Sequence, residues 1–186
     1  MYGEFAWRVL SKTLCYAASL IPEVGEGPVG IDDAMKLGYN WIQGPFEMMD
    51  SIGTGYMVER LDSEKRVVPD FLRNNAGSTF YSVENSRLSS VTDLGGKQVI
   101  TRPSGVVRFN EKKQTLVPQN CNEMASWYIS DNTAVVEFHS KANALDGESM
   151  AILADALSQV SSTGADGLLV HNDAQHFSCG VNLGAV

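Results

Sequence analysis

The segment FSCGVNLGAV, residues 177–186, holds the residue types best suited to chemistry in this chain. It follows a short apolar stretch, ADGLLVHN at 165–172, and predicts a glycine-bearing loop after a buried strand. Loops of this kind commonly aim backbone N–H groups at a ligand. Cys179 beside Gly180 could act as a nucleophile, but the sequence fixes no histidine near it, so we interpret it as a small buried hydrophobic residue. The loop therefore predicts ligand contact through its backbone.

Composition argues against several other kinds of chemistry. The chain has 186 residues and a formal net charge of −8, which argues against a nucleic-acid-binding surface. Its three cysteines show no disulfide framework, and neither they nor His139, His171 and His176 have metal-ligand spacing. No apolar run is long enough for a membrane span, and the first residues lack a signal-peptide layout. We therefore expect a reduced, cytoplasmic protein that holds no metal.

Residues 1–77 predict a compact bundle of about five short helices. Apolar residues at three- and four-residue spacing in 4–21 predict one buried helical face, made by Leu10, Leu14, Ala17 and Ile21 with Val9 and Thr13 alongside. Shorter helices are expected within 31–38, 44–53, 54–61 and 68–77. In 44–53, Pro45 suits the first helical position and Phe46 and Met49 are expected to face inward, whereas Thr54 is a candidate N-cap of the next helix.

The rest of the chain predicts a connector followed by an α/β segment. Residues 78–125 are rich in Ser, Asn, Gly and Thr, and predict a long linker with short strands such as STFYSV and KQVIT. From Ala125 on, SWYISDNTAVVEFHS predicts strand, turn and strand, with Ala134, Val136 and Phe138 on one buried face. A helix over 146–162 follows, with Asp146 as N-cap, and its core stripe is expected to be Met150, Leu153, Leu157 and Val160. With the strand at 165–172, this order predicts a βαβ unit with a parallel strand pair.

The segment IDDAMKLGYNWIQGPFEMMDSIG, residues 31–53, resembles the C-terminal helical domain of 3-hydroxyacyl-CoA dehydrogenases. Two motifs carry the resemblance, D-x-A-M/L-x-x-G and G-P-F/L-E-x-x-D-x-x-G. The residues that fit them are Asp33, Ala34, Met35, Gly38, Gly44, Pro45, Phe46, Glu47, Asp50 and Gly53. Because a fold motif is not by itself an active site, Glu47 and Asp50 are interpreted as caps and surface charges.

The segment VVEFHSKANALDGESMAILADAL…GLLVHNDAQHFSCGVNL, within residues 135–183, resembles the beginning of the crotonase (enoyl-CoA hydratase/isomerase) family. It matches that family's N-A-L segment and its F-S/A-A-G-A-D-L loop. The matching residues are Lys141, Asn143, Ala144, Leu145, Phe177, Ser178, Gly180 and Leu183. The chain departs from the family in having Val181 and Asn182 where Ala and Asp are common, so a role that needs a carboxylate at 182 is in doubt.

Together the two resemblances imply a segment of a bacterial bifunctional 3-hydroxyacyl-CoA dehydrogenase/enoyl-CoA hydratase that acts on acyl-CoA thioesters in fatty-acid β-oxidation. The implied fold is α+β. A small all-α domain over 1–77 is joined by the linker over 78–125 to an incomplete α/β crotonase-like segment over 126–186. NAD is implied as the cofactor of the parent enzyme, but this chain shows no G-x-G-x-x-G turn, since GTG at 53–55 continues as YMV.

The dehydrogenase resemblance also implies a catalytic Asn just before an Arg in the first helix. Here Trp7 precedes Arg8, and an indole cannot both donate and accept hydrogen bonds as an amide does. The helical domain is therefore expected to serve packing, self-association and the wall of an acyl-CoA cleft.

The crotonase resemblance implies an oxyanion hole of two backbone N–H groups that polarise the thioester carbonyl. One of them is the N–H of Val181. Substrate contacts are implied for Lys141, Ala142, Ala144, Cys179, Gly180 and Asn182. The second donor and the acid/base glutamates are expected beyond Val186, so the chain alone is expected to be inactive.

Other interpretations stay open from sequence. The chain could be a structural or dimerisation module without catalysis of its own, and Lys141 could equally be a solvated loop lysine. The parent's thioester reaction could also be that of a hydratase, an isomerase or a hydrolase. Acyl-CoA is the expected ligand in each enzymatic case.

Overall fold

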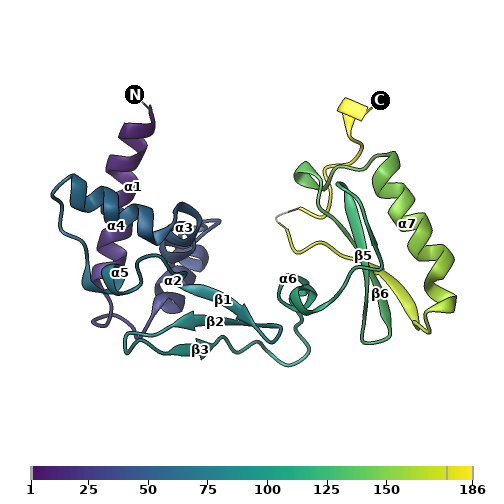
Figure 1. Ribbon diagram of the computed structural model, residues 1–186, viewed down its shortest axis with the longest axis horizontal. Coiled ribbons are helices and arrows are strands. Elements are labelled where there is room, and N and C mark those ends of the chain that lie inside the picture. Colours follow the sequence, from purple (N-terminus) through teal and green to yellow (C-terminus); the bar gives the residue numbers. More distant parts are fainter. Residues whose placement is uncertain (1, 175, 186) are drawn as a thin grey trace. The chain divides into compact units, whose positions relative to one another are not determined.

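The computed structural model describes residues 2–174 and 176–185, which form two compact units, Met1–Thr101 and Arg102–Val186. Helices and sheet occur in both units (Figure 1). The chain is thus of mixed helix and sheet, as the expected α+β class requires. The boundary between the two units lies between Thr101 and Arg102, inside the segment 78–125 that the sequence predicts as a linker. That segment is therefore shared between the two units.

The first unit begins with the expected helices, α1 (Tyr2–Ser19), α2 (Pro28–Tyr39), α3 (Pro45–Ile52), α4 (Thr54–Ser63) and α5 (Asp70–Asn74). Helix α1 buries Leu14 and Ala17 as predicted, and Ile21 beyond its end is buried too. The prediction for Val9 and Thr13 is wrong, because both lie on the exposed side of α1. The N-cap prediction for Thr54 is also wrong, since Thr54 is the first helical residue of α4 and its hydroxyl donates to the carbonyl oxygen of Ser78 at 2.5 Å.

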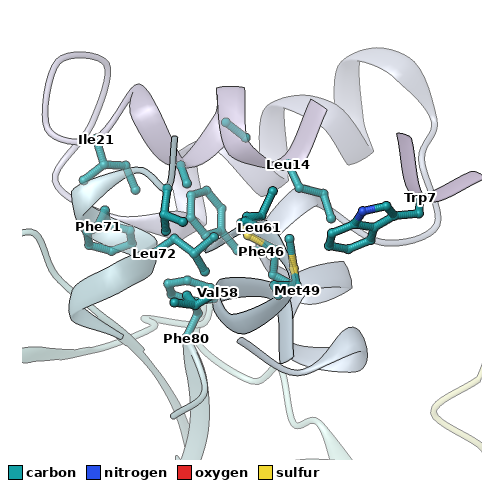
Figure 2. Packing of buried hydrophobic residues seen from close by; sticks show 14 residues of the cluster. Trp7, Leu14, Ile21, Phe46, Met49, Val58, Leu61, Phe71, Leu72 and Phe80 are labelled. Carbon is teal, nitrogen blue, oxygen red and sulfur yellow. The ribbon is translucent and has the colours of Figure 1, made fainter. Parts of the chain in front are cut away.

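An aromatic cluster forms the centre of this unit. Phe46 and Met49 of α3 are fully buried, as predicted, and Phe46 meets Phe71 and Phe80 edge to face, with ring centroids 5.9 and 5.0 Å apart. Phe71 and Phe80 stack on each other at 5.5 Å. Figure 2 shows these rings among the aliphatic side chains of α1, α4 and α5. The core thus joins helices that are far apart in the sequence.

A three-stranded antiparallel sheet completes the unit, in the order β1 (Tyr81–Glu84), β2 (Arg87–Val91) and β3 (Lys97–Val99). STFYSV overlaps β1 and KQVIT contains β3, as expected, while the polar run RLSSV of β2 gave no strand signal. Asn85 and Ser86 connect β1 and β2 with positive φ angles, as a tight hairpin turn needs. Val91 packs against the helical core, so this sheet belongs to the same compact unit.

The second unit is a four-stranded sheet in the order β4 (Asn120–Cys121), β5 (Ala125–Ser130), β6 (Thr133–Phe138) and β7 (Gly167–Val170). Strands β5 and β6 form the predicted hairpin, with Asp131 and Asn132 both at positive φ in its turn. Strands β6 and β7 are parallel, which confirms the predicted βαβ unit. Strand β7 lies at the edge of the sheet.

Helix α7 (Gly147–Gln159) lies along one face of this sheet (Figure 1). Asp146 caps it as predicted, accepting from the N–H groups of Glu148 and Ser149. The predicted core stripe is partly wrong: Leu153 and Val160 pack against the core, whereas Met150 and Leu157 are exposed. The buried face of α7 instead consists of Ser149, Ile152 and Ala156. Ile152 and Ala156 belong to the same core cluster as Trp127 and Val136 of the sheet.

The opposite face of the sheet is covered by α6 (Phe109–Lys112) and the following 3₁₀ turn (Lys113–Thr115). The ring of Phe109 meets that of Tyr128 edge to face at 5.4 Å. Lys113 donates to both carboxylate oxygens of the buried Glu137 at 2.8 Å. Both faces of β5 and β6 are therefore covered.

Candidate functional site

Two loops at one edge of the second unit hold all the residues for which the crotonase resemblance implies a site. The first loop, residues 139–146, follows β6, and the second, residues 171–183, follows β7. Since β6 and β7 are parallel, their carboxyl ends lie at the same edge of the sheet. We call the two segments the paired loops.

The first loop has an unusual backbone that the sequence did not reveal. Ala142 and Asn143 both have positive φ angles, 55° and 53°, a region that Asn tolerates better than most residues. The N–H of Cys179 donates to the carbonyl oxygen of Ala142 at 3.1 Å. The side chain of Asn143 donates to the carbonyl oxygen of His176 at 2.9 Å. Asn143 is buried, and its role is to tie the first loop to the second.

The second loop is fixed by its own hydrogen bonds as well. The hydroxyl of Ser178 donates to the carbonyl oxygen of Asn143 at 2.7 Å and accepts from the N–H of Gly180 at 3.0 Å. Gly180 has a φ of 91°, which favours glycine at this turn. Asn182 reaches the carboxylate of Asp146 at 3.3 Å. The positioning roles of Asn143 and Ser178 were missed, although both residues stand in the quoted motifs.

The backbone N–H of Val181 is the donor that this arrangement leaves available. Leu145 donates its N–H to the carbonyl oxygen of Gly180 at 2.8 Å and accepts from the N–H of Asn182 at 2.7 Å. Leu145 and Val181 thus form a parallel bridge in which Leu145 uses both of its backbone groups. In a parallel bridge of this kind the N–H and carbonyl of the opposite residue, here Val181, point away from the paired segment. The Val181 N–H therefore points away from Leu145, and its direction is fixed by the bonded residues on either side.

The other expected contact residues are distributed around this bridge. Ala144 is buried, while Lys141 and Ala142 are exposed. Lys141 forms no ion pair with any of the described residues. Cys179 is exposed, so its interpretation as a buried hydrophobic residue is wrong, since its backbone rather than its side chain joins the loop network.

The histidines take separate positions in the paired loops. His171 approaches the carboxylate of Asp173 at 3.2 Å, and Asp173 also accepts from the N–H of Asn110 at 3.0 Å. Burial raises the pKa of Asp173, but the Asn110 N–H and His171 hold it below its ordinary value. Within residues 2–174 and 176–185 no group of three metal-ligating side chains occurs. Asp173 serves here to cap α6 from a distant loop.

The dehydrogenase-like motif of the first unit forms a cap between two helices. The spacing of D-x-A-M-x-x-G puts its leading aspartate at Asp32, so the assignment of Asp33 to that position is wrong. Asp32 of α2 is completely buried and accepts from the N–H groups of Phe46 and Glu47, at 2.9 and 3.1 Å. The hydroxyl of Tyr81 donates to the same carboxylate at 2.9 Å. Gly44 leaves the room for it, because a Cβ there would lie 2.2 Å from the Asp32 carboxyl carbon. Burial raises the pKa of Asp32 to about 6, against the lowering effect of these donors.

The two other carboxylates of the motif are structural in the same way. Glu47 accepts from the N–H of Gly44 at 2.8 Å and from Lys36 at 2.6 Å. Asp50 accepts from the N–H groups of Phe80 and Tyr81, at 2.7 and 2.9 Å, and so ties α3 to β1. All the carboxylate contacts of this motif therefore hold helices and sheet together.

Trp7 stands where the dehydrogenase resemblance implies a catalytic Asn. It is buried, its indole N–H donates to Glu64 at 2.7 Å, and the guanidinium of Arg60 lies 4.3 Å from the centre of its ring. These contacts place Trp7 in the link between α1 and α4. The side chain thus fills a packing role.

The residues present do not fit NAD. Gly53 ends α3 and stands directly before α4, so the GTG sequence at 53–55 joins two helices, whereas a dinucleotide turn follows a strand. A Cβ at Gly55 would lie 3.4 Å from the backbone of Gly77, so this glycine stands close to a neighbouring chain segment.

A shallow groove of about 360 Å³ lies elsewhere in the first unit, between the start of α2 and strands β2 and β3. Its rim carries Glu26 and Asp33, and it contains none of the residues that either motif implies for a site. No helix in the described ranges is long and apolar enough to cross a membrane.

Comparisons with known proteins agree with the dehydrogenase motif. The chain is 30% identical over 188 residues to a protein of Bacillus subtilis named as a probable 3-hydroxyacyl-CoA dehydrogenase, a match that covers 99% of this chain and 24% of that protein. It is 25% and 24% identical to proteins of Rickettsia felis and Rickettsia prowazekii that are named as fatty acid oxidation complex trifunctional enzymes. Those two matches each cover 98% of this chain and 23% of the relative.

The chain therefore spans about a quarter of the length of the curated relatives it matches. No family model matches it, and no solved structure matches it. The similarity runs through both units, because each match covers nearly the whole chain.

Proposed function

We propose that this chain is a segment of a cytoplasmic bacterial fatty-acid β-oxidation enzyme, in which the second unit contributes part of an acyl-CoA thioester site. The names of the relatives support the substrate class. The observation that carries the site is the Val181 N–H, which points away from Leu145 and has no hydrogen-bond partner in the part of the chain that the structure describes. In this proposal the N–H of Val181 donates to the thioester carbonyl oxygen.

The proposal assigns distinct roles to the two units. In the parent enzyme, the first unit belongs to the NAD-dependent 3-hydroxyacyl-CoA dehydrogenase part and the second to the crotonase-like part, and NAD binds outside this chain. The caps made by Asp32 and Asp50 support a structural role for the first unit. In this proposal the exposed Lys141 meets the anionic end of the CoA ligand.

One oxyanion donor is not enough for turnover. Removing a single donor of an oxyanion hole costs about 2.7–4 kcal/mol of transition-state stabilisation in serine proteases, and removing acid/base groups costs a further factor of about 10²–10⁴. We therefore expect binding of a thioester without hydration of it by the chain alone. Clear hydration of crotonyl-CoA by the purified chain would contradict this assignment.

Calorimetry with acetoacetyl-CoA tests the binding role. Val181→Pro removes the N–H and leaves the Leu145 hydrogen bonds possible, because the bridge does not use that N–H. We expect the Kd to rise about three- to tenfold, the size of one net hydrogen bond. The matched control is Val181→Ala, which shortens an exposed side chain, keeps the N–H and should bind as the unsubstituted chain does. Absence of heat with the unsubstituted chain, or equal Kd values for both variants, would overturn the proposal.

A second candidate function is that of an association module without catalysis of its own. One observation favours it, the apolar outer face of α1, where Tyr2, Phe5 and Tyr16 are exposed. Light scattering separates the two functions: a dimer that gives no heat with acetoacetyl-CoA supports the module alone.

A further inference from the structure

The side chain of Asn182 is hydrogen-bonded at both ends within the chain. Its amide N–H donates to the carboxylate of Asp146 at 3.3 Å, and its amide oxygen accepts from the N–H of Gly184 at 3.2 Å. A side-chain amide offers both a donor and an acceptor, and this residue uses one of each. Asn182 follows Val181 directly, so these bonds hold the backbone on one side of the proposed thioester donor.

The carboxylate of Asp146 divides its two oxygens between two segments. One oxygen accepts from the N–H groups of Glu148 and Ser149 at the start of α7, at 3.1 and 3.0 Å. The other accepts from Asn182, so a single carboxylate joins the N-terminus of α7 to the loop that carries Val181. The hydrogen bond from Ser149, together with those from Asn182 and Glu148, holds the pKa of Asp146 below its ordinary value. Asp146 is therefore charged at neutral pH.

This side-chain contact lies beside the backbone bridge that fixes Val181. Asn182 donates its own N–H to the carbonyl oxygen of Leu145 at 2.7 Å, and Asp146 follows Leu145 directly. An aspartate at position 182 would put a second carboxylate against Asp146 where the amide donor now lies, and two carboxylates so close together repel each other. The residue type that position 182 accepts thus depends on the charge at position 146.

We propose that Asn182 is a positioning residue, whose neutral amide pairs with the charged Asp146 and thereby holds the Val181 N–H in place. The Asn182 side chain then contacts the chain itself and not the ligand. The expected effect on ligand binding rests on the proposed thioester site, whereas the pairing of the two side chains is testable without any ligand.

Swapping the two side chains tests the pair by calorimetry with acetoacetyl-CoA. In Asn182→Asp two carboxylates meet, so the bonded arrangement is less populated and the Kd should rise about tenfold at neutral pH. In the double variant Asp146→Asn with Asn182→Asp, the amide at 146 caps α7 as well as a carboxylate does and donates to the carboxylate at 182. The Kd of this swapped pair should return to within about threefold of the unsubstituted value.

The matched control is Asn85→Asp in the exposed turn between β1 and β2. It makes the same change of charge in the other unit and should leave the Kd unchanged. Asn85 has a positive φ angle, which aspartate also tolerates, so the fold of the turn should persist.

The loss in Asn182→Asp should also depend on pH. The groups that face the carboxylate of Asp146 are the N–H groups of Glu148 and Ser149 and the side chain at 182, and it forms no ion pair with any of the described residues. In the variant, the second carboxylate raises the pKa of one member of the pair, and the proton bound there replaces the lost donor. Its Kd, relative to the unsubstituted chain at the same pH, should be closer to normal at acidic than at neutral pH. A loss of packing alone would not change with pH.

Hydrogen exchange at the Leu145 amide separates failure of this inference from failure of the thioester site. That N–H donates to the carbonyl oxygen of Gly180 in the ligand-free chain, so its exchange rate needs no ligand. It should exchange about tenfold faster in Asn182→Asp and at the original rate in the swapped pair. Absence of heat with the unsubstituted chain would contradict the thioester site, and the exchange rates would still decide the pairing. The inference is overturned if Asn182→Asp leaves exchange at Leu145 unchanged, or if the swapped pair behaves as Asn182→Asp does.

Discussion

The core of the first unit and the paired loops of the second unit differ in how they place large apolar side chains. Around its centre the first unit buries three phenylalanine rings, Phe46, Phe71 and Phe80, in mutual contact. The second unit buries Trp127 and Phe138 between β5, β6 and α7, but leaves Phe177 and Leu183 exposed in the second of the paired loops. Burial of this kind stabilises a fold, whereas exposed apolar side chains beside the proposed thioester donor are available to a ligand.

The carboxylates show the same difference. In the first unit, Asp32 and Asp50 accept hydrogen bonds from backbone N–H groups of helices and strands that are distant in the sequence. In the second unit Asp146 and Asp173 also cap helices, but they do so from within the paired loops. The carboxylates of the first unit thus hold its own core together, whereas those of the second unit fix the loops that carry the proposed site. Three substitutions test this comparison.

The largest effect is expected for an aromatic ring of the first core. Phe46→Ala leaves a cavity between Phe71 and Phe80 and should lower the free energy of unfolding of that unit by about 3–5 kcal/mol. Phe177→Ala removes an exposed ring of the second unit and should change stability by less than about 0.5 kcal/mol. Urea denaturation measures both. Equal losses would show that Phe177 is packed and that the comparison fails.

A smaller effect is expected for the buried cap. In Asp32→Asn one amide oxygen still accepts from Phe46, but the amide nitrogen faces the N–H of Glu47, so stability should fall by about 2 kcal/mol. Asp33→Asn, on the exposed neighbour, is the control and should have little effect. If Asp33→Asn lowered the free energy of unfolding as much as Asp32→Asn, the capping role of Asp32 would be contradicted.

The same variant gives a pH dependence of known sign. Burial raises the pKa of Asp32 to about 6, so the folded state binds the proton more tightly than the unfolded state does. The stability linked to this proton is present below the ordinary value of 3.8 and is lost as the pH rises through about 6. The stability of the unsubstituted chain relative to Asp32→Asn should therefore be greater at acidic than at neutral pH. The opposite trend would show that the three donors, and not burial, dominate.

The smallest effect is expected at the start of α7. Ser149 is fully buried, and its hydroxyl accepts from the N–H of Asp146 at 2.8 Å. Ser149→Ala leaves this N–H without a partner and should cost about 1 kcal/mol. Ser158→Ala, on the exposed side of the same helix, is the matched control and should be near neutral. Thermal unfolding followed by circular dichroism distinguishes the two.

Periodicity and turn residues predicted the helices of the first unit, the hairpin of β5 and β6 and the parallel pair of β6 and β7. These signals failed where packing or pairing with other elements decides which residues are buried or form a strand. Val9 and Thr13 have the spacing of buried residues but lie on the outer face, because α1 also turns Trp7 and Ser11 inward. Strand β2 is polar and is held by pairing with β1 and β3 rather than by an apolar pattern.

For the candidate site, the sequence motifs predicted which residues belong to it but not how the two loops are held together. Resemblance pointed to Val181 and its neighbours, and the structure brings those loops together. It could not show that Ala142 and Asn143 take positive φ angles, or that Asn143 and Ser178 bond across the loops, since these contacts join residues more than thirty positions apart. Gly44 is similar: its need for glycine comes from Asp32, twelve positions earlier.

The most direct test of the account is an amide chemical-shift titration of the ¹⁵N-labelled chain with acetoacetyl-CoA. A donor that gains an acceptor shifts its resonance, so the account predicts the largest change at Val181, with smaller changes at Gly180, Asn182 and Ala142 in the paired loops. The helical core around Phe46 should not respond. Largest changes in the groove between α2 and β3, or no change at Val181 on saturation, would contradict the assignment of the thioester site to the paired loops.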